Sequence, residues 1–194
     1  MSPHDSPWRR PGAVLLLSCY ELGHQPLGIA SPMAFLQQAG FAPAAIDTAV
    51  ERLDPQAVLA ARFVGIAVPM HTALRLGVRA AERVREINPS CHLAFYGLYA
   101  HLNADYLLGH VADAVIGGEF EAALLALVQT LEAGGSGNVA GVSGRNRPAA
   151  PVLDRLRFVV PSRVALPALA EYARALQAVQ GPRPSEMAEL VQLV

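Results

Sequence analysis

Residue types that can do chemistry gather in four polar stretches, each of which follows an apolar run in the sequence. These stretches read YELGHQPLG (20–28), PMHT (69–72), YGLYAHLN (96–103) and GGEFE (117–121). Imidazoles and carboxylates can ligate metals or carry protons, aromatic rings can line a flat ligand, and glycines let a backbone approach a ligand closely. The four stretches therefore predict a ligand site, provided that the fold brings them to one place.

The first stretch is longer than the ~2 to 6 residues usual between a strand and a helix, and such an excess more often serves a function. Gly23 and Gly28 would admit a ligand. The pair Ser31 and Pro32 is typical of a helix N-cap followed by the first helical position. His24 could ligate a metal or be a polar loop residue packed by its neighbours. Because no second ligand follows at helical spacing, the sequence favours the polar loop residue and predicts no metal ligand.

The second and third stretches each have two interpretations. His71 and Thr72 open a helix, where free N–H groups can hold an anionic or polar ligand, and Thr72 is compatible with a plain N-cap. Tyr96, Tyr99 and His101 could line the side of a flat ligand, or they could only seal the end of the sheet.

Thiol and carboxyl groups add two further candidates. Cys19 could act as a nucleophile with His24 or His71 as its base, but a cysteine at a strand end is usually a small buried apolar residue. Glu119 and Glu121 lie at a helix start, where carboxylates are stabilised by the helix dipole, so we expect at least one of them to cap that helix.

Composition excludes several classes of protein. A net charge of −1 and a pI near 6.6 predict no nucleic-acid partner. Neither GxxxxGK[ST] nor GxGxxG occurs, which excludes ordinary kinases and dehydrogenases, and two cysteines without a CxxC pair predict no iron–sulfur or structural zinc site made by this chain alone. No apolar run approaches the ~20 residues of a membrane span and the start is rich in proline, so we expect no membrane partner and a cytoplasmic protein.

Apolar runs and helical segments alternate along the chain. The runs that predict strands are AVLLLSC (13–19), a weaker APAAIDTAV (42–50), RFVGIAV (62–68), CHLAFYG (91–97) and DAVIGG (113–118). The order predicts an α/β fold with a doubly wound (flavodoxin-like or Rossmann-like) five-stranded parallel sheet and helices on both faces. We expect this domain at residues 12–134, a Gly- and Pro-rich linker at 135–163 and a helical tail at 164–194. Ligands of such sheets bind beyond the carboxyl ends of the strands, where all four polar stretches should meet.

Three segments carry a resemblance to a known family. VLLLSCYELGHQPLGIASPMAFLQQAGF, GIAVPMHTALRLGVRAAERVREINP and YGLYAHLNADYLL with VADAVIGGEFEAAL resemble the N-terminal cobalamin (B12)-binding-type domain of B12-dependent radical SAM proteins. More narrowly, they are similar to the CUAEP/CCAEP-tail radical SAM group. The segment RFVVPSRVALPALAEYA resembles the connection from that domain to the radical SAM barrel.

The resemblance implies a module that holds cobalamin over the carboxyl edge of the sheet, with a groove between sheet and helices for the nucleotide tail. The residues expected to bind the cofactor are Tyr20, Glu21, Gly23, His24, Gly28, Pro69, Met70, His71, Thr72, Tyr96, Gly97, Tyr99, Gly117, Gly118 and Glu119. The CxxxCxxC cluster motif is absent, so the [4Fe-4S] cluster and S-adenosylmethionine would belong to a barrel in cis or in trans, and the chain would be a fragment, a truncated product or a separate subunit.

Two alternatives remain open at this point. One is a cofactor-free domain that covers the barrel or presents substrate to it, and the other is a small enzyme that uses Cys19 and His71.

The family motif Asp-x-His-x-x-Gly, in which the histidine binds cobalt, is absent from the first stretch. Leu22 stands where the motif has Asp, two residues before His24, and Gly28 comes one position late. We therefore expect His24 to be a polar neighbour of the cofactor and not a cobalt ligand.

Overall fold

The computed structural model describes residues 6–180. Its six-stranded sheet has the order β2-β1-β3-β4-β5-β6, with the first five strands parallel and β6 antiparallel to β5. The strands are β1 (Val14–Ser18), β2 (Ala44–Asp47), β3 (Phe63–Ala67), β4 (His92–Tyr96), β5 (Ala114–Ile116) and β6 (Val142–Ser143). The helices are α1 (Leu27–Gln38), α2 (Pro55–Ala60), α3 (His71–Ile87), α4 (Leu98–Leu102), α5 (Ala104–His110), α6 (Phe120–Glu132) and α7 (Leu169–Gln180).

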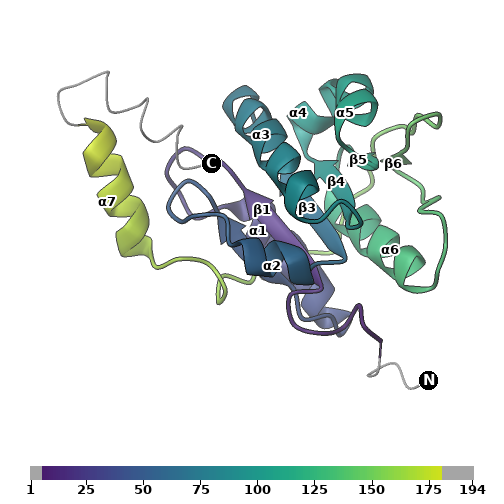
Figure 1. Ribbon diagram of the computed structural model, residues 1–194, viewed down its shortest axis with the longest axis horizontal. Coiled ribbons are helices and arrows are strands. Elements are labelled where there is room, and N and C mark those ends of the chain that lie inside the picture. Colours follow the sequence, from purple (N-terminus) through teal and green to yellow (C-terminus); the bar gives the residue numbers. More distant parts are fainter. Residues whose placement is uncertain (1–5, 181–194) are drawn as a thin grey trace.

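The central strands are buried on both faces, as their uniformly apolar sequences predict. Every residue of β1 and β3 is buried. Because successive side chains point to opposite faces of a sheet, Leu15 and Leu17 enter one core cluster and Leu16 enters the other. Helices α2, α3, α4 and α5 cover the first cluster, and α1 and α6 cover the second (Figure 1). The predicted doubly wound α/β fold is confirmed.

The number of strands differs from the prediction of five. Strand β6 comes from the segment that we expected to be a linker, and the same segment adds a parallel bridge between Gly118 and Val152. A two-residue strand leaves almost no periodic pattern in the sequence, which is why it was missed. The predicted loop at 96–103 also contains α4, a five-residue helix without a side-chain cap that no sequence signal marks.

The chain beyond the expected linker returns to the sheet. The amide of Gln25 donates a hydrogen bond to the carbonyl of Pro167 (2.8 Å), and Leu166 is buried in the second core cluster. On α7, the hydroxyl of Tyr172 donates to Asp47 Oδ2 at the end of β2 (2.9 Å). The remainder of the predicted tail, 181–194, lies outside the described residues. Among residues 6–180, no helix combines the length and apolar character needed to cross a membrane.

Candidate functional site

The four polar stretches begin at one edge of the sheet. The last residues of four strands form a row, in which Ser18 pairs with Ala67, Ala67 with Tyr96, and Tyr96 with Ile116. The strand order reverses at β1 and β3, because β1 is followed by β2 on one side and β3 by β4 on the other. Parallel α/β sheets bind ligands at such a switch point, so this carboxyl edge is the candidate site.

The loop after β1 is held by the side chain of Glu21. Helix α1 begins at Leu27, so the predicted N-cap at Ser31 and first helical position at Pro32 were wrong. The helix has Pro26 at its N-cap, which offers no capping side chain, and Glu21 instead accepts hydrogen bonds from the N–H groups of Leu27 (2.9 Å) and Gly28 (3.3 Å). Burial raises the pKa of Glu21, while these two hydrogen bonds act against the increase. Glu21 thus positions the loop and the start of α1.

Pro32 lies inside α1 and creates a second anchor for the loop. Without an N–H, Pro32 cannot donate to the carbonyl of Gly28 four residues earlier. The hydroxyl of Tyr96 donates to that carbonyl at 2.8 Å. The ring of Tyr96 is fully buried and packs on Phe120 at a centroid distance of 4.8 Å. Tyr96 therefore lies beneath the edge, where it positions Gly28, and its ring occupies space between the sheet and α1 and α6 where we expected a groove.

The outer part of the same loop forms a tight turn. Leu22 (φ 55°) and Gly23 (φ 74°) both adopt the left-handed conformation, and the N–H of His24 donates to the carbonyl of Glu21 (3.0 Å). The side chain of His24 is exposed, whereas Tyr20 is half-buried against the first core cluster. His24 is therefore free to face a bound molecule at the edge but is not fixed by a carboxylate partner in the described structure.

The stretch after β3 leads directly into α3. Met70 occupies the N-cap and His71 begins the helix, so the predicted N-cap at Thr72 was wrong. Pro69 and Met70 are half-buried, while His71 and Thr72 are exposed. The ring of His71 meets the ring of Tyr99 edge-on, with 6.4 Å between centroids. The β3 and β4 stretches thus lie side by side, as predicted.

Glycines at the ends of β4 and β5 are explained by packing within the chain. A Cβ atom on Gly117 would lie 2.6 Å from the ring of His101, and one on Gly118 would overlap the carbonyl of Val152. Gly97 has a positive φ of 102° and packs against the backbone of Val68, the residue after β3. These positions require glycine whether or not a ligand is bound.

Glutamates at the start of α6 have roles other than the expected cap. Glu119 occupies the N-cap position, but neither it nor any other side chain makes a capping hydrogen bond to the described helix. Glu121 accepts a hydrogen bond from Ser31 on α1 through Oε1 (2.6 Å). Its Oε2 atom is buried and has no hydrogen-bond partner within residues 6–180.

Exposed leucines are a feature of this edge that the sequence analysis missed. Leu22, Leu27, Leu98 and Leu102 are between 50% and 66% exposed, and all four belong to the stretches after β1 and β4 or to the helices that these stretches begin. Large apolar side chains left exposed at a ligand-binding edge of a sheet are candidates for contact with a bound molecule. The signal in the sequence was leucine within otherwise polar stretches.

The thiol of Cys19 does not support the stand-alone enzyme. Burial raises its pKa to about 12, although a hydrogen bond with Thr48 lowers it in part. A reactive cysteine needs an accessible thiolate at neutral pH. Cys19 is instead a buried apolar residue at the end of β1, as the simpler interpretation predicted.

The edge suits a corrin ring better than a metal ion. Within the described residues, no three His, Cys, Asp or Glu side chains come close enough together to hold a metal. A corrin ring has broad apolar faces and a periphery of amides. The exposed leucines match the faces, and the exposed side chains of His24, His71 and Thr72 offer polar groups to the amides. The residues present therefore fit a corrin ring, although no open groove for its nucleotide tail lies where Tyr96 is packed.

Comparisons with known proteins show a shared fold. No family model and no curated protein matches the chain. It is similar to radical S-adenosylmethionine methyltransferase TsrM from Kitasatospora setae in two structures. The structure with tryptophan substrate and a SAM analog matches at 15% identity and a TM-score of 0.58, over 73% of this chain and 30% of that chain. The structure with cobalamin and a [4Fe-4S] cluster matches at 15% identity and a TM-score of 0.59, over 77% of this chain and 31% of that chain. It is also similar to the cobalamin-dependent S-adenosylmethionine radical enzyme OxsB with aqua-cobalamin bound, at 14% identity and a TM-score of 0.61, over 84% of this chain and 25% of that chain.

The similarity covers most of this chain but only a part of each neighbour. The match spans about a quarter to a third of the neighbours' own length. At 14–15% identity these matches show a common fold alone, and two of the three matched structures contain cobalamin. None of them points to the CUAEP/CCAEP-tail group, so that narrower assignment is not retained.

Proposed function

We propose that this chain is the cobalamin-binding module of a radical SAM enzyme and holds the corrin ring over the carboxyl edge of the sheet. The observation that carries this assignment is the set of exposed leucines in the stretches after β1 and β4, at the carboxyl edge of a fold shared with two cobalamin-containing enzymes. Cofactor sites in sheets of this kind lie at the carboxyl edge and are lined mainly by apolar side chains.

Each nearby residue then has a definable task. Leu22, Leu27 and Leu98 would contact a face of the ring, and Glu21 would hold the loop of Leu22 and Leu27 through the N–H groups at the start of α1. Bound cobalamin would supply a cobalt–carbon bond for methyl transfer or radical chemistry. His24 would be a polar neighbour, because metal-bound histidines almost always have an orienting partner and the nearby carboxylate, Glu21, is engaged by the N–H groups of Leu27 and Gly28.

A partner barrel would supply the remaining chemistry. The chain has two cysteines, both buried, and no CxxxCxxC motif, so it does not itself provide the thiolates of a [4Fe-4S] cluster. We infer that a radical SAM barrel, in cis or in trans, holds the cluster and S-adenosylmethionine. The greater length of the neighbouring enzymes is consistent with such a barrel.

A second function is favoured by the packing beneath the edge. Tyr96 fills space between the sheet and the helices, where a groove for the cofactor's nucleotide tail was expected, and the glycines that follow β5 contact other parts of the chain. A domain with this interior could cover a radical SAM barrel or present substrate to it without binding a corrin.

Cobalamin retention separates the two functions. Purified chain is mixed with hydroxocobalamin and passed through gel filtration, and the visible spectrum of the protein peak is recorded. We expect retention, and we expect Leu98→Asp to weaken it at least tenfold because a carboxylate would face the apolar ring. Leu59→Asp is the matched control, since Leu59 is similarly exposed (54% against 62%) but lies on α2.

The possible outcomes decide between the functions. Retention by the wild type and by Leu59→Asp, with loss in Leu98→Asp, would support the cofactor module. Absence of retention by the folded wild type would instead favour the cofactor-free domain.

A further inference from the structure

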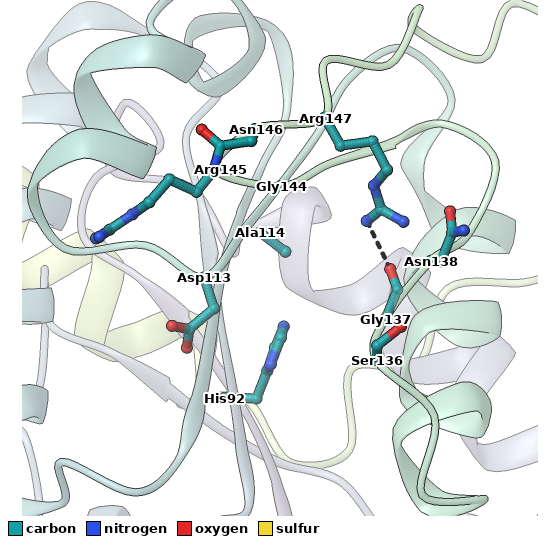
Figure 2. A pocket seen from close by; sticks show the side chains of 10 residues that line it. All are labelled: His92, Asp113, Ala114, Ser136, Gly137, Asn138, Gly144, Arg145, Asn146 and Arg147. Carbon is teal, nitrogen blue, oxygen red and sulfur yellow. Dashed lines mark hydrogen bonds between the residues drawn. The ribbon is translucent and has the colours of Figure 1, made fainter.

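A polar cavity of about 360 Å³ lies at the amino edge of the sheet, opposite the candidate cobalamin site (Figure 2). Its floor comes from His92, the first residue of β4, and from Asp113, which precedes β5. Its walls are the loop after α6 (136–138) and the hairpin after β6 (144–147). Since β4 has five residues, about 16 Å of strand separates this cavity from the carboxyl edge.

Basic side chains outnumber acidic ones in the cavity lining. Arg145, Arg147 and His92 contribute to it, against the single carboxylate of Asp113. That carboxylate is already paired outside the cavity, because its Oδ2 accepts a hydrogen bond from the guanidinium of Arg85 at 2.6 Å. The charge that remains uncompensated within the cavity is therefore positive.

His92 has an unsatisfied ring nitrogen. Its imidazole stacks on Phe63, with 5.9 Å between centroids and 10° between ring planes, and Figure 2 shows the ring pointing into the cavity. The Nε2 atom is buried and has no hydrogen-bond partner in the described part of the chain. Burial lowers the pKa of His92, and the nearby carboxylate of Asp113 offsets this effect only in part. An anionic oxygen in the cavity would accept a hydrogen bond from the ring and further stabilise its charged form.

Arg147 is fixed in place on the opposite wall. Its backbone exchanges two hydrogen bonds with Gly144, both of 2.9 Å, which close the hairpin. Its guanidinium donates to the carbonyl of Gly137 (2.9 Å), as the dashed line in Figure 2 shows. A guanidinium has five N–H donors, so most of them remain for a ligand, and the side chain needs little further ordering to bind one.

We propose that this cavity binds a small organic anion through carboxylate or phosphate oxygens, with His92 and Arg147 as hydrogen-bond donors and Arg145 at the side where Asp113 lies. A space of this size falls within the range of small-molecule sites and exceeds what a single inorganic ion needs. The site is independent of cobalamin, because none of its residues belongs to the carboxyl edge.

Titration of the full chain with inorganic phosphate, and separately with malonate at constant ionic strength, tests this site. We expect at least one of the two anions to cause saturable ¹H–¹⁵N shifts of residues 136–147 and of the His92 imidazole. Arg147→Gln and Arg145→Gln should each raise the dissociation constant about tenfold, the usual effect of losing one charge-assisted hydrogen bond. Arg79→Gln, on the exposed face of α3, should leave binding unchanged.

The anions and variants together decide the outcome. Response to phosphate alone or to malonate alone would support the site and identify the class of its ligand. If Arg147→Gln disrupts the hairpin, Arg145→Gln decides, because Arg145 is exposed. Saturable binding of neither anion, or equal weakening by Arg79→Gln, would overturn the proposal.

Discussion

The hydrogen bond between Tyr96 and the Gly28 carbonyl exists because Pro32 interrupts α1. In an uninterrupted helix, the N–H of residue 32 would bond to the carbonyl of residue 28. Pro32 has no N–H, and the hydroxyl of Tyr96 takes that place at 2.8 Å. Tyr96→Phe should therefore leave the carbonyl without a donor and loosen the first turn of α1.

The expected loss of stability is about 1 to 2 kcal/mol. Phenylalanine keeps the buried ring and its contact with Phe120, so the change removes only the hydroxyl. An unsatisfied buried polar group costs about 1 to 3 kcal/mol. Because Gly28 is only half-buried and water can reach part of its backbone, the lower part of that range applies.

A double-mutant cycle measured by urea denaturation tests the cause. Pro32→Ala restores a backbone N–H that can donate to Gly28, so Tyr96→Phe should then reduce the free energy of unfolding by only about 0.5 kcal/mol. The expected coupling between the two positions is about 1 kcal/mol, within the range for residues that share a partner.

Tyr106→Phe provides the control for removal of a tyrosine hydroxyl. Tyr106 lies exposed on α5, and its replacement should change stability by less than about 0.5 kcal/mol. An equal effect of Tyr96→Phe in the wild-type and Pro32→Ala backgrounds would refute the explanation given for the Gly28 carbonyl.

Three further predictions concern the rest of the chain. Burial raises the pKa of Asp47 from 3.8 to about 6, so between these pH values the folded state keeps a proton that the unfolded state loses. The free energy of unfolding should therefore fall by about 3 kcal/mol as the pH rises from about 4 through 6. In urea denaturation at a series of pH values, Asp47→Asn should abolish this dependence. His24→Ala should retain cobalamin with an unchanged visible spectrum, whereas loss of a nitrogen-ligated cobalt signal would make His24 a ligand. Limited proteolysis should cut first within residues 153–160, near the exposed Leu153 and Phe158. Mass spectrometry should then find a protease-resistant core that includes β6, whereas a stable core ending at Gly134 would contradict the pairing of β6 with β5.

The sheet could be predicted because its strands have an unambiguous composition. A run such as VLLLS is too short for a helix and too apolar for a half-exposed strand, and the structure buries all five of its residues. Short connections with alternating helices then leave few topologies, and the observed order is one of them. Strand β6 and helix α4 were missed because each is too short to show a period.

Helix boundaries at the site depend on contacts that are distant in sequence. Ser31 followed by Pro32 is a sound local signal for an N-cap and first helical residue, yet α1 has Pro26 and Leu27 in these positions, five residues earlier. The extra turn is stabilised by Glu21, which lies outside the helix, and by Tyr96, which is on another strand. A rule that considers only neighbouring residues has no access to either contact.

Side-chain exposure at the carboxyl edge is the reverse of what residue type suggests, and this changes which residues support cobalamin binding. Tyr96 was expected to face the ligand and is fully buried, while Leu22 and Leu98 were given no role and are more than half exposed. Gly117 was expected to make room and instead accommodates the ring of His101. A large cofactor at this edge would therefore be bound by exposed apolar side chains and not by space left at glycines, so leucine substitutions are the more direct test of the proposed site.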